Sequence, residues 1–179
     1  SELEDILRRL REEVKRLREE SRKLLEDNRR LVEEVKRESD KVLKRLKDKA
    51  DRLKELAERG DLDEEMAERV ERELRRILEE HKRKSKEIED ESEKLDREHK
   101  ESTREVVERI KKELDDARRR GIPTREIKTV IDELTRELER LNREHEDLTR
   151  KLREELKKLN KRIKDLIDTL KKLLEDLKK

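Results

Sequence analysis

Cysteine and aromatic residues are absent from the sequence, and each absence excludes classes of function. Without cysteine the chain can form no disulfide, no thiolate metal site and no cysteine nucleophile. Without Phe, Tyr or Trp it has no stacking platform for nucleic-acid bases and none of the bulky anchors that dominate binding hot spots. A conventional recognition surface is therefore not expected.

Long apolar runs and an excess of one charge are also missing. No apolar run exceeds two residues, too short for a transmembrane span or the core of a signal peptide. The 55 basic and 53 acidic residues alternate and leave a net charge of +2, so no field builds up to attract phosphate or anionic lipid. We expect a soluble protein of a kind made in a bacterial cytoplasm, with no nucleic acid and no membrane as partner; the natural compartment is not predicted.

What the sequence does contain is charge and regularly spaced leucine. Charged residues make up 60% of the chain and hydrophobic residues 28%, with only 2 Gly and 1 Pro. Disordered chains share the high charge, but they lack periodic leucine and are richer in Pro and Gly. From Leu3 to Ala57 the positions expected to be buried, here called the seam, recur about every 3.6 residues. This spacing predicts a nearly straight helix with one buried stripe.

The first helix is expected to begin at Ser1, because Ser1 and Glu4 have the spacing of a capping box. Gly60 supplies the left-handed conformation that ends a helix. Asp61 and Glu64 repeat the capping pattern and are expected to start the next helix.

A second turn is predicted at Gly121, Pro123 and Thr124, where Gly ends a helix, Pro cannot continue it and Thr can cap its successor. Short turns make neighbouring helices antiparallel. The predicted fold is all-α, a single antiparallel three-helix bundle domain over residues 1–179, with helices at about 1–59, 62–120 and 124–179.

Apolar doublets widen the buried stripe beyond that of a two-stranded coiled coil. Examples are Leu24 with Leu25 and Leu166 with Ile167. The spacing places Leu24 and Leu166 on the seam itself.

The seam turns polar in the middle of the chain without losing its helical period. Twelve candidates for a buried polar network follow from this spacing: Ser21, Asn28, Ser39, His81, Ser85, Ser92, His99, Thr103, Asn142, His145, Thr149 and Asn160. Such a stripe is either a solvated face or a set of buried hydrogen-bonding layers.

The turns favour burial, because they bring polar residues of different helices to the same height. Residues equally far from Gly60 should meet, and the pairs are Ser39 with His81, Asn28 with Ser92, and Ser21 with His99. The second turn should place His99 beside His145, Ser92 near Thr149, Thr103 near Asn142, and Ser85 near Asn160. Buried layers must be hydrogen-bonded, because each unsatisfied buried polar group costs about 1 to 3 kcal/mol.

Other roles for these residues are weaker. Zinc needs three or four ligands, and only His99 and His145 are placed to meet. Ser beside His is reminiscent of a hydrolase, but a charged bundle offers no oxyanion hole or evident cleft. No cofactor, metal site or catalytic residue is predicted, and the chain is not expected to be an enzyme.

The near-ideal helix propensity, capped turns, missing aromatics and layered Ser, Asn, Thr and His resemble computationally designed helical bundles with buried hydrogen-bond networks. The resemblance covers the whole chain and implies a structural scaffold with no natural substrate and no required partner. Natural rods such as spectrin repeats fit less well, because they usually have aromatic core residues. Two alternatives remain: a helix-pairing module that self-associates or binds a further helix, and a pH response through buried histidine.

Overall fold

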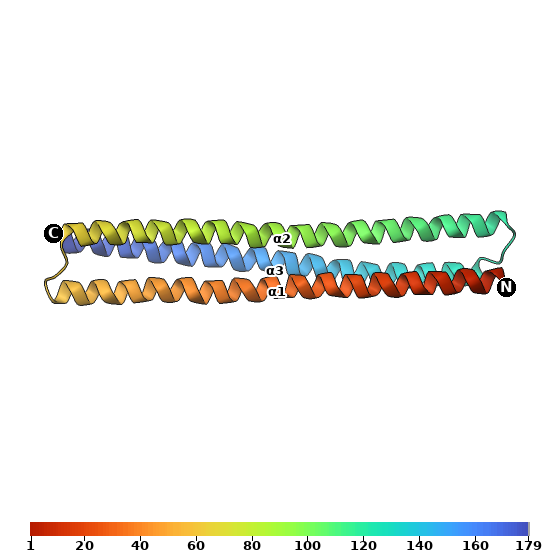
Figure 1. Ribbon diagram of the computed structural model, residues 1–179, viewed down its shortest axis with the longest axis horizontal. Helices are drawn as coiled ribbons and strands as arrows, with labels where there is room; N and C mark the ends of the chain where they lie inside the picture. The colour runs from red at the N-terminus through yellow and green to blue at the C-terminus, as the bar shows by residue number, and fades with distance from the viewer. Residues whose placement is uncertain (179) are drawn as a thin grey trace. The chain divides into compact units, whose positions relative to one another are not determined.

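A computed structural model describes residues 1–178, and these residues form three helices joined by two short connections (Figure 1). The helices are α1 (Glu2–Glu58), α2 (Glu64–Arg119) and α3 (Arg125–Lys178), packed against one another as a three-helix bundle. The predicted ends differ from these by one or two residues, and Lys179, the predicted end of the third helix, lies outside the described residues. No helix within 1–178 combines the length and apolar character needed to cross a membrane.

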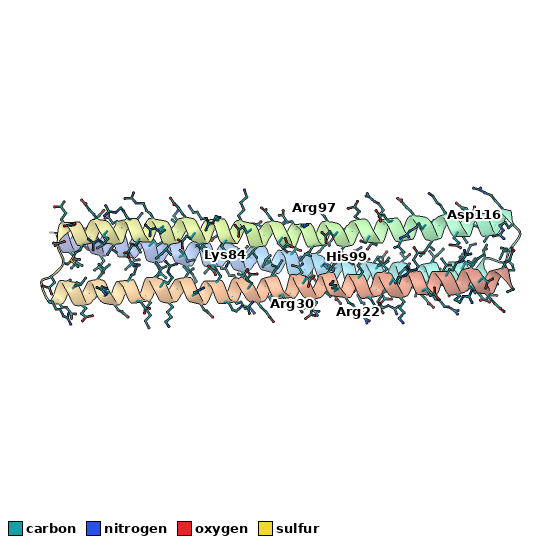
Figure 2. All side chains as sticks on the ribbon, in the orientation of Figure 1. Arg22, Arg30, Lys84, Arg97, His99 and Asp116 are labelled. Carbon is teal, nitrogen blue, oxygen red and sulfur yellow. The ribbon has the colours of Figure 1, made fainter. Side chains whose placement is uncertain are left out.

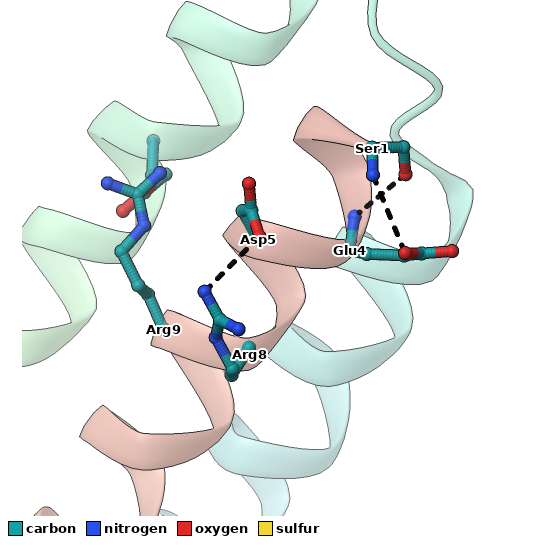
Figure 3. Close-up of polar contacts among 6 residues, drawn as sticks. Ser1, Glu4, Asp5, Arg8 and Arg9 are labelled. Carbon is teal, nitrogen blue, oxygen red and sulfur yellow. Dashed lines mark hydrogen bonds and ion pairs between the residues drawn. The ribbon is translucent and has the colours of Figure 1, made fainter.

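The start of α1 has the predicted capping contacts (Figure 3). The backbone N–H of Glu4 donates to Ser1 Oγ at 3.3 Å, and the terminal ammonium of Ser1 donates to the Glu4 carboxylate at 3.5 Å. In the next turn Arg8 donates to Asp5 at 3.2 Å. Acidic side chains in this first turn also complement the positive end of the helix dipole.

Each connection contains a glycine in the left-handed conformation, two residues after the last residue of the helix. The φ angles of Gly60 and Gly121 are 71° and 70°. After α1, Gly60 N–H donates to the carbonyl of Ala57 and Asp61 N–H to that of Leu56. At the end of α2, the N–H groups of Gly121 and Ile122 donate to the carbonyls of Arg118 and Ala117 in the same pattern. Both α1 and α2 therefore end in a Schellman motif.

The cap of α2 differs from the predicted one. Asp63, not Asp61, accepts a hydrogen bond from the backbone N–H of Met66, at 2.8 Å. Asp61 lies at the end of α1, where its backbone N–H donates to the carbonyl of Leu56. The predicted cap at Asp61 is therefore wrong, and α2 begins two residues later than expected.

The chain groups into two compact units, each containing part of all three helices. Unit 1 comprises Ser1–Arg30 and Glu91–Arg150. Within it α1 runs antiparallel to α2, as shown by the ion pairs of Glu2 with Arg120 and of Glu13 with Arg109. Its apolar core is built from these buried residues: Ile6, Leu7, Leu10, Leu17, Val106, Ile110, Ala117, Ile127, Leu134 and Leu138.

Unit 2 comprises Leu31–Asp90 and Lys151–Lys179. Its apolar core is built from these buried residues: Val42, Leu46, Leu53, Ala67, Leu74, Ile77, Leu159, Ile163, Ile167, Leu170 and Leu174. The prediction of one domain over residues 1–179 stays a prediction.

In the two doublets named above, the second residue is buried more deeply than the first. Leu166, predicted to lie on the seam, is 39% exposed, whereas Ile167 is 2% exposed. Likewise Leu24 is half-buried and Leu25 is buried. The seam prediction is wrong at Leu166, because a one-residue step turns a side chain by about 100° around the helix.

Candidate functional site

The first polar layer of unit 1 is organised around the side-chain amide of Asn28, which is fully buried. Ser92 Oγ donates to Asn28 Oδ1 at 2.8 Å, and Asn28 Nδ2 donates to Thr149 Oγ1 at 3.4 Å. Asn28 belongs to α1, Ser92 to α2 and Thr149 to α3. One amide therefore links the three helices at a single level, as the distances from the two turns predict.

The second layer of unit 1 contains Ser21 of α1, His99 of α2 and His145 of α3, all buried. The hydroxyl of Ser21 is hydrogen-bonded to Nε2 of His99, and Nε2 of His145 lies 3.4 Å from the backbone carbonyl oxygen of Ser21. The two imidazole rings are stacked, with centroids 4.1 Å apart and planes inclined by 28°. Figure 2 shows His99 pointing between the helices, whereas the exposed Arg22 and Arg97 point away from them.

Both stacked histidines resist protonation. Burial, together with the charge that His145 would carry, lowers the pKa of His99 to about 4. Burial also lowers the pKa of His145, against the opposing effects of the Ser21 carbonyl, Asp96 and Glu144. At neutral pH both rings are therefore neutral, and each has one N–H donor and one acceptor nitrogen.

Thr103 and Asn142 lie beside this layer and are only partly buried as residues. Their oxygens Oγ1 and Oδ1 are nevertheless buried, and neither has a hydrogen-bond partner. The side chain of Asn142 raises the pKa of His99, although no hydrogen bond is formed between the Asn142 oxygen and Nδ1 of His99. Thr103 and Asn142, predicted to lie near each other, are not hydrogen-bonded through these oxygens.

Unit 2 contains a third polar cluster, centred on the buried His81 of α2. Nε2 of His81 lies 2.6 Å from Asn160 Oδ1 and 3.2 Å from Ser85 Oγ. Asn160 is exposed as a residue, so this cluster reaches the surface. Ser39, expected opposite His81, is partly exposed, and His81 bonds to Asn160 and Ser85 in its place.

Sequence reasoning did not single out the ion pairs that border the seam between helices. In unit 1, Arg18 of α1 pairs with Glu137 of α3 at 2.5 Å. In unit 2, Lys49 of α1 pairs with Glu73 of α2, and the pairing lowers the pKa of Glu73. The opposite charges flanking each apolar stripe could have predicted such pairs, as they do in coiled coils.

The central residues of the two polar layers of unit 1 are at most 1% exposed: Asn28, Ser92, Ser21, His99 and His145. A groove of unit 1 between α1 and α3 is lined by residues such as Val14, Arg18, Val130 and Glu137, none of which belongs to a layer. Among residues 1–178 there is no group of three or more His, Asp or Glu side chains that could hold a metal ion. Within each of the two layers, hydrogen bonds join side chains of different helices.

No protein-family model matches the chain, and no curated protein matches it either. A solved structure titled "Computationally designed three helix bundle" is similar, with a TM-score of 0.46 and 24% sequence identity. The match covers 98% of this chain and 88% of the other. Because the identity and the TM-score are both low, the fold assignment rests on the three helices of this chain and not on that likeness.

Proposed function

We propose that this chain is a structural scaffold, whose buried polar layers determine which helix faces pair and at what height. One observation carries the proposal: the Asn28 amide is paired on both sides, with Ser92 of α2 and Thr149 of α3. A shift of one helix by a turn would separate these partners and leave buried groups unpaired. Each such group costs about 1 to 3 kcal/mol, so shifted arrangements are penalised far more than in an all-leucine core.

The distribution of apolar side chains favours a scaffold over a helix-pairing module. Among the described residues, Leu166 is the one large hydrophobic side chain classed as exposed. A groove awaiting a further helix would expose a contiguous apolar patch of several hundred Å². The same regular burial, together with the capped turns and absent aromatics, supports the resemblance to computationally designed bundles and a role without catalysis.

The proposal is tested by making the first layer apolar with Asn28→Leu, Ser92→Ala and Thr149→Val in one chain. Replacing buried polar groups with apolar ones of similar volume is often neutral or stabilising, so we expect no loss of stability. We expect the parent to refold from denaturant to one species near 22.0 kDa and the variant to give a mixture of masses. A variant that refolds as uniformly as the parent would show that the layer does not select the pairing.

A second candidate function, a response to acid, is favoured by the stacked pair of His99 and His145. Both rings are buried, and their pKa values are lowered. Protonation would place a positive charge between helices where no anionic partner is hydrogen-bonded to either ring. We therefore propose that acid destabilises the layer around Ser21.

A further inference from the structure

We propose that Ser21 sets the direction of a hydrogen-bond chain through the second layer of unit 1, and that this chain holds His145 and His99 in opposite neutral tautomers. The chain runs from His145 to the Ser21 carbonyl, and from the Ser21 hydroxyl through His99 to Asn142. This inference rests on the proposed function, because it requires the layer to be buried and paired.

The tautomer of His145 follows from the chemistry of its partner. Nε2 of His145 lies 3.4 Å from the backbone carbonyl oxygen of Ser21. A carbonyl oxygen can only accept, so Nε2 carries the hydrogen. In the neutral ring Nδ1 is then the acceptor, and this atom is buried.

The tautomer of His99 follows from two buried atoms that lack partners. These are Nδ1 of His99 and Oδ1 of Asn142. Asn142 lies one helical turn from His145 on α3, and the ring of His145 is stacked on that of His99. Asn142 also raises the pKa of His99, as an acceptor beside the ring would. If Nδ1 carries the hydrogen, it can donate to Oδ1 of Asn142, and Nε2 accepts from the Ser21 hydroxyl. In the other tautomer Nδ1 and Oδ1 would be two buried acceptors with no donor between them.

The opposite tautomers define where an added proton can go. The unprotonated nitrogens are Nε2 of His99, which accepts from Ser21, and Nδ1 of His145, which has no partner. A proton on Nε2 of His99 meets the hydrogen of the Ser21 hydroxyl, so the hydroxyl must turn from donor to acceptor. A proton on Nδ1 of His145 enters a buried position with no hydrogen-bond acceptor. Either route breaks the chain as it stands in the neutral protein.

The charges around the pair come from two of the three helices. On α2, Asp96 favours the protonated form of His99 and Lys100 opposes it. On α3, Glu144 favours the protonated form of His145, as Asp96 does from α2. From α1 the rings meet Ser21, which is uncharged.

The test is imidazole ¹H–¹⁵N correlation NMR on the uniformly labelled full chain near pH 7.5, about one unit above the ordinary histidine pKa. We expect His99 to show a protonated Nδ1 and a bare Nε2, and His145 the reverse. In Ser21→Ala, which removes the hydroxyl but keeps the carbonyl, the Nε2 signal of His99 should shift because its hydrogen-bond donor is lost, while the Nδ1–H of His99 and the Nε2–H of His145 persist. Ser39→Ala, a serine on the same helix outside the layer, should leave both rings unchanged.

The outcomes separate this inference from the proposed function. If both rings show averaged tautomers and titrate near the ordinary pKa of about 6.5, the layer is solvated and both proposals fail. If both rings titrate well below that value but share one tautomer, the layer is buried and only the directional chain is wrong. A Ser21→Ala variant with unchanged His99 signals would also overturn the hydrogen-bond chain, because it would show that the Ser21 hydroxyl does not bond to Nε2 of His99.

Discussion

At the scale of single residues, the two units differ in how their histidines are held. In unit 1 both rings are buried against Ser21, and the nearby amide of Asn28 is paired on two sides. In unit 2 the partner of His81 is the exposed Asn160. If the polar layers select the helix pairing as proposed, the layers of unit 1 should contribute most, because an unpaired atom there cannot bond to water.

Replacing Asn28 with alanine removes the amide that joins Ser92 to Thr149. Both hydroxyl groups then lose a partner, and a cavity is left, so the free energy of unfolding should fall by about 2 kcal/mol or more. Chemical denaturation measures the loss. Ser39→Ala, at a partly exposed polar position of the same helix, should change it by less than about 0.5 kcal/mol. Equal effects of the two substitutions would mean that Asn28 is not a buried, paired group.

The doublet of Leu166 and Ile167 gives a second test at this scale. Ile167 is 2% exposed within the apolar core of unit 2, whereas Leu166 is 39% exposed. Ile167→Ala should lower the free energy of unfolding by about 2 to 4 kcal/mol, and Leu166→Ala should change it by less than about 0.5 kcal/mol. A larger loss at Leu166 than at Ile167 would show that the seam follows the first residue of the doublet.

Residue pairings could be predicted only in part from the sequence. Distance from a turn gives the height of a residue along the bundle, and this suffices for Asn28 with Ser92 and Ser21 with His99. It does not give the direction of the side chain around the helix axis. His81 accordingly bonds to Asn160 and Ser85, while Ser39 at the matching height lies partly exposed.

At the scale of the helices, the ends are determined by local hydrogen bonds that short sequence patterns reveal well. Gly60 and Gly121 end their helices as predicted, each with φ near 70°. The start of α2 was harder to predict, because Asp61 and Asp63 both have a capping side chain. Asp63 directly precedes the first residue of α2 and accepts from the Met66 N–H, whereas Asp61 lies within the Schellman motif that closes α1.

This assignment of the α2 cap is tested by two matched substitutions. Asp63→Ala removes the acceptor for the Met66 N–H and should cost about 1 kcal/mol of unfolding free energy. Asp61→Ala keeps the backbone bond to Leu56 and should cost less than about 0.5 kcal/mol. Thermal or chemical denaturation of the two variants compares them directly. A greater loss for Asp61→Ala would restore Asp61 as the cap.

At the scale of the whole molecule, acid should weaken the fold through His99 and His145. Their folded-state pKa values lie below about 6.5, the ordinary value of an unfolded chain. Above that pH neither the folded nor the unfolded chain binds the proton, so the histidines do not lower the free energy of unfolding. As the pH falls toward about 4, where His99 itself titrates, the unfolded chain takes up protons that the folded chain resists, and stability falls.

From about pH 7.5 to about pH 5, His99 alone should remove about 2 kcal/mol from the free energy of unfolding, at 1.36 kcal/mol per pH unit. Chemical denaturation at the two pH values measures this change. His99→Gln with His145→Gln should abolish most of it, whereas the control His81→Gln should keep it because the stacked pair is intact. A parent that is equally stable at both pH values would contradict the neutral, buried pair.

The architecture as a whole was the most predictable level, because it depends on period and composition and not on single contacts. Alternating charge around one apolar stripe predicts long helices, and two glycine turns fold them into three. Grouping into two compact units was not predicted. The grouping depends on where contacts are densest, and a seam that repeats regularly about every 3.6 residues does not reveal that.

The central claim is that a single chain buries its own apolar residues and supplies the partners of its own polar layers. It is tested most directly by the mass of the parent protein in solution, measured by light scattering at neutral pH over a range of concentrations. A single chain with a complete core should give a mass near 22.0 kDa that does not rise with concentration. A mass at a multiple of this value would show that the seam is completed by a second copy, and would contradict the account.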